Sequence, residues 1–151
     1  AMRAGSHRGR VGARRAAVQA IYQWLIAGGH PENIVAEFVS DRELIKVDLD
    51  YFSELTRRVP QQYDALVALI APALDREWSR VDTVERAVLL LGAYELVHCL
   101  HIPWRVAVNE AVELAKMFGA EDAHRYINGV LDKVAHETRK FEIDGNSPLS
   151  V

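Results

Sequence analysis

The stretch VNEAVELAKMFGAEDAHRYINGVLDKV, residues 108–134, decides the fold class of this chain of 151 residues. Apolar residues recur at helical spacing in both of its halves, before and after Gly119. Glycine is common just after the last turn of a helix, so Gly119 is expected to separate two helices. The residues expected to face the core are Val108, Ala111, Val112 and Ala115 in the first helix and Ile127, Val130, Leu131 and Val134 in the second.

The pair Asn128-Gly129 stands in the middle of the second of these helices. Between alternating strands this pair signals a hairpin, but the flanking residues here have helical spacing. A glycine inside a helix costs about 1 kcal/mol relative to alanine. We therefore expect Gly129 to allow the close approach of another helix. We also expect the side chain of Asn109 or Asn128 to be buried and bonded to a neighbouring helix end.

Helical periodicity fills most of the remaining chain, and no segment alternates apolar and polar residues as a strand does. The sequence therefore predicts an all-α protein of about seven helices. Asp82 begins the most apolar of them, and Glu85, three residues later, completes the pattern of a capping box. The expected helices cover residues 11–27, 32–39, 48–60, 63–72, 82–100, 103–119 and 120–137.

We expect these helices to form two small helical bundles packed together as one domain, with a division near residues 72–81. The parts expected are a basic flexible N-terminal arm (1–10), an N-terminal helical subdomain (11–72), a C-terminal helical subdomain (73–140) and a flexible tail (141–151).

Charge is distributed unevenly along the chain. Residues 1–31 contain five of the 18 basic residues and no acidic residue, whereas the remainder carries 13 basic and all 21 acidic residues. A basic terminus on an acidic body favours a localised anionic partner over a protein that coats nucleic acid uniformly. By charge alone, a solvated terminus without a partner is an equally good interpretation.

Arg10, Arg14 and Arg15 lead directly into the first expected helix. Arg15, Gln19 and Tyr22 recur at i, i+4 and i+7 and so line one flank of it. A cation, an amide and an aromatic ring together suit single-stranded RNA with unstacked bases. Tyr22 also extends the apolar stripe of this helix, and the sequence leaves open whether it belongs to the core.

The single cysteine, Cys99, excludes a disulfide framework and predicts a reducing compartment. The sequence contains no run of about 18 apolar residues, so it predicts no membrane-spanning helix. The basic N-terminus is not followed by the apolar segment of a signal peptide. We expect a cytoplasmic protein that needs no cofactor.

Catalysis is not expected, because the chain shows neither a Ser-His-Asp constellation nor a glycine-rich phosphate loop. The sharpest enzyme alternative is a helical metal site, since Glu95–His98 and Glu121–His124 both match Glu-x-x-His. Glu121 follows Gly119 at a helix start, where an acid simply complements the helix dipole. No metal ligands are therefore assigned. The glutamates that would complete such a site are Glu54, Glu110 and Glu113.

Three segments resemble the NusB family of bacterial transcription antitermination factors and keep the order of its motifs. They are RRAAVQAIYQW (14–24), DTVERAVLLLGAYEL (82–96) and the stretch 108–134. The resemblance spans most of the chain and implies an all-helical fold of two small bundles. It also implies a non-catalytic role, in which the protein binds boxA RNA, a short single-stranded element, together with the small-subunit ribosomal protein NusE. The pair would then join the RNA polymerase antitermination complex, chiefly in ribosomal RNA transcription.

The residue pattern and the resemblance together predict the contact residues. Tyr126 is expected to stack on a base and Arg125 to reach a phosphate, whereas Asp122 would repel phosphate and hold RNA affinity down until the partner binds. The predicted RNA contacts are Arg10, Arg14, Arg15, Gln19, Tyr22, Arg125 and Tyr126. The predicted partner contacts are Tyr22, Glu85 and Asp122.

The chain departs from the family at the arginine cluster of the N-terminal arm, which Val11, Gly12 and Ala13 interrupt. Arg3 and Arg8 are the candidates to compensate, and the strength of RNA binding without the partner is left undecided. The alternatives kept open are a NusB-like RNA-binding module with a diverged role in ribosomal RNA maturation and a pure protein-interaction module. The oligomeric state is also open, including a homodimer that would cover the RNA face.

Overall fold

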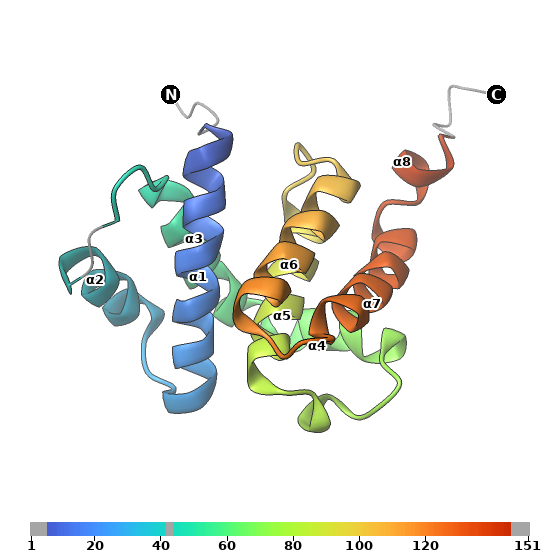
Figure 1. Ribbon diagram of the computed structural model, residues 1–151, viewed down its shortest axis with the longest axis horizontal. Coiled ribbons are helices and arrows are strands. Elements are labelled where there is room, and N and C mark those ends of the chain that lie inside the picture. Colours follow the sequence, from blue (N-terminus) through green and yellow to red (C-terminus); the bar gives the residue numbers. More distant parts are fainter. Residues whose placement is uncertain (1–5, 42–43, 146–151) are drawn as a thin grey trace. The chain divides into compact units, whose positions relative to one another are not determined.

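The computed structural model describes residues 6–41 and 44–145, which form helices joined by loops and turns (Figure 1). Eight α-helices and two short 3-10 helices follow one another in this described part, which confirms the predicted all-α class. None of these helices is both long and apolar enough to cross a membrane. The chain divides into two compact units between Tyr63 and Asp64, ahead of the predicted boundary at residues 72–81.

The first unit consists of α1 (His7–Ala27), α2 (Pro31–Asp41) and α3 (Leu49–Gln61). Helix α1 begins before the predicted residue 11, because the Ser6 hydroxyl accepts a hydrogen bond from the Gly9 backbone N–H at 2.9 Å. Residues 7–10 are therefore helical and not part of a flexible arm, and residues 1–5 lie outside the described part. The Asp48 carboxylate caps α3 in the same way through the Tyr51 N–H.

The core of the first unit lies where α3 packs on α1 and α2. The rings of Phe38 and Phe52 stack there with centroids 5.7 Å apart. Large apolar side chains buried at such helix contacts are the main stabilising contribution, at about 1.5–3 kcal/mol each. Other residues buried in this unit are Ala13, Ala17, Ile21, Ile34, Leu55 and Val59.

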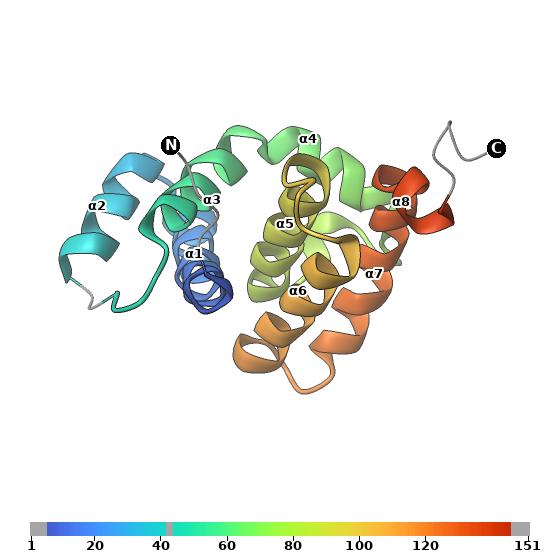
Figure 2. The same cartoon turned by 90° about the horizontal axis from the view of Figure 1, so that it is seen from above.

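The second unit begins within α4 (Tyr63–Ile70) and contains two 3-10 helices, η1 (Ala71–Ala73) and η2 (Trp78–Arg80). Its main helices are α5 (Thr83–His98), α6 (Trp104–Phe118) and α7 (Ala123–Thr138), followed by the short α8 (Lys140–Asp144). Helices α5, α6 and α7 pack on one another and lie side by side in both views (Figures 1 and 2). Every residue from Ala87 to Leu96 is buried, which confirms the central place predicted for α5.

The predicted division at residues 72–81 differs from the observed one because helical periodicity runs on across the break between α3 and α4. Pro60 lies in the last turn of α3, and α4 starts again at Tyr63. Leu66 and Ile70 keep the apolar spacing of the preceding residues, yet they belong to the second unit. The period of a pattern shows which face is buried, but it does not show which core buries that face.

Gly92 on α5, rather than Gly129, is the glycine that permits close helix packing. A Cβ at Gly92 would lie 2.6 Å from Leu131 Cδ1, whereas a Cβ at Gly129 would have nothing within 4 Å. Gly129, Asn128 and Asn109 are all exposed, so the predictions of close packing and of a buried asparagine were wrong. The core face of α7 carries Ile127, Val130, Leu131 and Val134, which turns the Asn128-Gly129 pair toward solvent.

The C-terminal segment is anchored by two charged side chains. Arg139 is 5% exposed and donates to the carbonyl oxygens of Leu96, Glu95 and Cys99 at 2.7, 3.3 and 3.2 Å, which caps the end of α5. Glu142 pairs with Arg139 and accepts a hydrogen bond from the Trp104 N–H at 2.8 Å, at the start of α6.

The predicted ends of the second unit change accordingly. Residues 141–144 are helical, not a flexible tail, and residues 146–151 lie outside the described part. Gly119 follows the last residue of α6 as expected, but α7 begins only at Ala123. Asp82 occupies the N-cap of α5 without a side-chain cap hydrogen bond, so the predicted capping box with Glu85 does not form.

Candidate nucleic-acid interface

The outer flank of α1 presents the cation, amide and aromatic ring predicted for RNA binding. Arg15 is exposed, Gln19 is half-buried and Tyr22 is 40% exposed. The Gln19 amide donates to the Arg15 carbonyl at 3.0 Å, one turn away along the helix. Tyr22 therefore lies outside the core, which answers the question that the apolar stripe left open.

Arg14 corrects one part of the predicted RNA-binding set. It is 2% exposed, and its guanidinium lies 5.8 Å from the centre of the Tyr51 ring on α3. Successive residues of a helix point about 100° apart, so Arg14 faces the core while its neighbour Arg15 faces outward. An arginine buried in this way packs within the unit and is not presented at the surface of α1, where the RNA was expected to bind. Arg10 is half-buried on the same helix.

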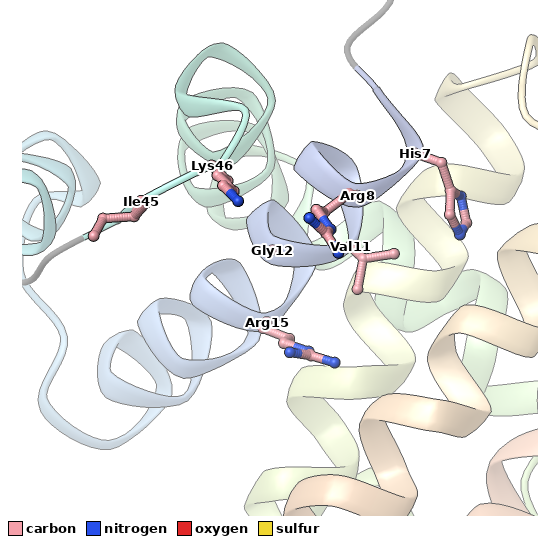
Figure 3. A pocket seen from close by; sticks show the side chains of 7 residues that line it. All are labelled: His7, Arg8, Val11, Gly12, Arg15, Ile45 and Lys46. Atoms are coloured by element: carbon pink, nitrogen blue, oxygen red, sulfur yellow. The ribbon is translucent and has the colours of Figure 1, made fainter.

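A pocket of about 440 Å³ opens beside the exposed flank, between the first half of α1 and the segment before α3 (Figure 3). Of the seven described residues that line it, three are arginine or lysine, one is His7, and none is acidic. The structure thus adds two residues, His7 and Lys46, that the sequence did not suggest. Their distance along the chain hides the cluster, which forms only when the segment folds against α1. The lining residues are His7, Arg8, Val11, Gly12, Arg15, Ile45 and Lys46.

In the second unit the structure brings Glu85, Asp122 and Tyr126 together. They line a pocket of about 410 Å³ with Arg76, a residue that no sequence motif had indicated. The Arg76 guanidinium lies 4.5 Å from the centre of the Tyr126 ring and forms an ion pair with Asp75 at 2.7 Å. This contact covers one face of the ring, so a base that stacks there must share the ring with Arg76 or displace it.

The charges around this second pocket influence one another. Burial raises the pKa of Glu85, the neighbouring carboxylate of Asp82 raises it further, and Arg76 partly offsets both. Burial also raises the pKa of the Tyr126 hydroxyl, with a further contribution from Asp75. The hydrogen bond from Arg76 lowers the pKa of Asp75. The pocket therefore contains both signs of charge, each partly matched within the protein.

Asp122 and Arg125 are the exposed charges at the start of α7. Asp122 stands at the N-cap position, yet its side chain makes no cap hydrogen bond, so its carboxylate is not required by the helix. Arg125 projects to solvent beside the half-buried Tyr126. Of the two predicted RNA contacts in this unit, Arg125 is therefore more accessible to a ligand than Tyr126.

The Glu-x-x-His pairs do not form the cluster that a metal enzyme would need. Glu95 is fully buried within α5, and Glu121 lies in the turn before α7. Across residues 6–41 and 44–145, no three side chains of His, Cys, Asp or Glu come together in a way that could hold a metal ion.

Comparison with known proteins agrees with this helical fold. Residues 12–136 match the sequence profile of the NusB family. The transcription antitermination protein NusB of Thiobacillus denitrificans is 48% identical over 132 residues, which cover 87% of this chain and 91% of that protein. The NusB of Pasteurella multocida is 47% identical over 82% of this chain and 85% of its own length.

Two solved structures share the fold. The NusB of T. maritima has a TM-score of 0.66 and 28% identity, covering 93% of this chain and 99% of that one. The second is a crystal structure of the antitermination factors NusB and NusE in complex with double-stranded RNA. It has a TM-score of 0.74 and 25% identity, and covers 87% of this chain and 99% of that chain.

Proposed function

The chain belongs to the NusB family of non-enzymatic transcription antitermination proteins, and we propose that it binds single-stranded boxA RNA jointly with NusE. The observation that carries this proposal is the exposed flank of Arg15, Gln19 and Tyr22, set beside a pocket whose described lining includes three arginine or lysine side chains and no acidic one. The proposed setting is the bacterial cytoplasm, where the bound RNA and partner join the transcribing RNA polymerase.

The arginine and lysine side chains that line the pocket of the first unit are available to an anion. Arg8, Arg15 and Lys46 form no ion pair with any carboxylate in the described residues. Arginine presents a planar fork of donors to phosphate and also stacks on bases, and Tyr22 adds an exposed ring on the same helix. Single-stranded RNA offers phosphates and unstacked bases together, which is the ligand that this surface matches.

The mixed-charge pocket of the second unit supports a contact with a protein. Glu85 and Asp122 present carboxylates beside Arg76, so the pocket carries charges of both signs. A protein partner can place a cation near the two acids and an acidic group near Arg76. Complementary charges of this kind select a partner and guide its approach. We assign Glu85 and Asp122 to the NusE contact, and Arg125 with the open edge of Tyr126 to the RNA that the partner helps to hold.

The test is binding of fluorescently labelled boxA RNA and of a scrambled RNA, with and without NusE, over a range of salt concentrations. We expect tighter binding to boxA RNA, further tightening by NusE, and an affinity that falls with salt by about 0.7 log units per log unit for each phosphate contacted. Equal and weak binding to both RNAs, unaffected by NusE, would overturn the proposal.

Two substitutions separate the surfaces. Arg15→Gln should weaken RNA binding with or without NusE, because it removes a cation from the RNA face. Glu85→Arg should remove the tightening by NusE and leave the RNA binding of the protein alone unchanged or slightly stronger. Arg58→Gln is the control, since it removes an exposed charge from α3 in the first unit but does not line the cationic pocket.

A further inference from the structure

We infer that the pocket between α1 and the segment before α3 is a nucleotide subsite, in which Lys46 binds a backbone phosphate of the RNA. This inference rests on the proposed RNA binding and adds to it a residue and a subsite. The phosphate would lie among Arg8, Arg15 and Lys46 (Figure 3). The attached ribose or base would pack on an apolar side chain of the pocket lining, Val11 or Ile45.

The segment before α3 is held against α1 by a backbone hydrogen bond and by a close contact at Gly12. The Asp48 backbone N–H donates to the Gly9 carbonyl at 3.1 Å. A Cβ at Gly12 would lie 3.0 Å from Val47 Cγ2, closer than side chains normally pack. Glycine is a poor helix former, but at Gly12 it lets Val47 approach the helix directly.

Lys46 has an unusual backbone conformation at this point, with φ of 61°. Among the described residues other than glycine, Lys46 is the one with a positive φ. Residues that carry a Cβ seldom adopt this backbone conformation. Such strain recurs at binding sites, where the surrounding structure holds it in place. Here the hydrogen bond from Asp48 to Gly9 and the contact of Val47 with Gly12 hold the neighbouring residues, and the Lys46 side chain is left exposed at the pocket.

The electrostatics of the pocket favour an anion. Arg8, Arg15 and Lys46 gather around it, and like charges brought together repel one another until an anion lies among them. Among the described residues of the segment, 44–48, the acid is Asp48, and its carboxylate accepts a hydrogen bond from the Tyr51 N–H at the start of α3. The 68% exposed Ile45 adds an apolar wall, which inorganic phosphate would not use but a ribose or base would.

This arrangement also accounts for the interrupted arginine cluster of α1. Gly12 lies within the interruption, and it is the residue that admits Val47 and so brings Lys46 to the helix. The cation absent from α1 at this point is thus supplied by another segment of the chain. The RNA face of the first unit therefore consists of two segments, α1 and residues 45–46.

The first experiment compares Lys46→Gln with Arg58→Gln in the full-length protein, using the same labelled boxA RNA with and without NusE. Both variants lose one exposed positive charge from the first unit, but only Lys46 lines the pocket. We expect Lys46→Gln to bind about fivefold more weakly at low salt, with a salt slope shallower by about 0.7, and Arg58→Gln to match the wild type. Equal effects of the two substitutions would overturn the subsite.

The second experiment changes the geometry and keeps every charge. Gly12→Ala should push Val47 away and weaken RNA binding, whereas Gly129→Ala, where a Cβ meets nothing within 4 Å, should leave it unchanged. Far-ultraviolet circular dichroism of both variants confirms that they are folded. RNA affinity of Gly12→Ala equal to that of the wild type would contradict the proposed role of the segment.

The outcomes distinguish this inference from the proposed function. If the wild type shows no salt-dependent RNA binding, both are wrong. If Arg15→Gln weakens binding while Lys46→Gln behaves like Arg58→Gln, the RNA-binding function stands and the Lys46 subsite is wrong. Weakening by both Arg15→Gln and Lys46→Gln, with Arg58→Gln unchanged, supports the subsite.

Discussion

The two units use positively charged side chains in different ways. In the first unit, Arg8, Arg15 and Lys46 surround a pocket and form no ion pair within the described part of the chain. In the second unit, Arg139 is buried and bonded to three carbonyl oxygens and to Glu142. Burial and the number of partners, rather than residue type, separate a cation that binds a ligand from one that holds the fold.

The glycines show the same contrast. Gly12 admits a segment of the chain to the surface of α1, where that segment carries Lys46. Gly92 admits the Leu131 side chain into the core of the second unit. Close packing thus shapes a surface in the first unit and stabilises the interior in the second. The four predictions below test this contrast, beginning with the largest effect.

Arg139→Met should destabilise the protein by about 3 kcal/mol, because three carbonyl oxygens at the end of α5 lose their shared donor and Glu142 loses its partner. Urea unfolding measures the loss. Lys140→Met is the control, since that side chain is exposed and its pair with Glu137 is long, at 3.7 Å. A similar unfolding free energy for both variants would remove the contrast between the two kinds of cation.

Gly92→Ala should cost about 1–3 kcal/mol, since its Cβ would lie 2.6 Å from Leu131 Cδ1 in a packed core. Gly129→Ala should instead stabilise the protein by up to about 1 kcal/mol, because its Cβ meets open space and alanine is the better helix former. Thermal unfolding of the two variants should shift in opposite directions. A shift of the same sign would show that crowding does not distinguish the two positions.

Glu142→Gln should lower stability at neutral pH by less than about 1 kcal/mol, because its side chain is 37% exposed and its charge is screened by solvent. Burial alone would raise the pKa of Glu142, but the Trp104 N–H and Arg139 together lower it below the usual 4.5. The stabilisation from the charged form is therefore present above about pH 4.5 and is lost as pH falls through the lower pKa of the folded protein. Urea unfolding from neutral to acid pH should bring the two proteins together, and a constant difference would contradict this account.

Asp122→Asn should raise RNA affinity about twofold at low salt, and the gain should disappear at high salt as charges are screened. The carboxylate is exposed and makes no cap hydrogen bond, so the substitution should leave α7 intact. Asp132→Asn, on the same helix, is the control for net charge. Unchanged affinity of Asp122→Asn at low salt would show that this acid does not oppose RNA binding.

Much of the fold could be read from local patterns. The period of the apolar residues predicted the all-α class, and the continuous apolar surface of α5 predicted its central place. Gly119 ended α6 as expected. These features depend on residues only a few positions apart, whose spacing itself determines which side chains share a helix face.

The sites were predicted less completely, because burial and contact depend on distant segments. Arg14 and Arg15 are adjacent and chemically identical, yet one is 2% exposed and the other faces outward. Lys46 and Arg76 carried no pattern that linked them to α1 or to Tyr126. An isolated cation in a sequence has no visible partner, so its role cannot be read until its neighbours are known.

What the sequence by itself determined was the helical class, the core faces of most helices, the family and the presence of a basic surface on the first helix. Only the tertiary structure decided that Gly92 packs closely while Gly129 lies open, that Glu142 caps α6, and that Lys46 joins the pocket beside Arg15. The physical reason is the separation along the chain of the residues that interact. Helix periodicity and capping act within a few residues, whereas packing, pairing and pocket formation join residues that only the folded chain brings together.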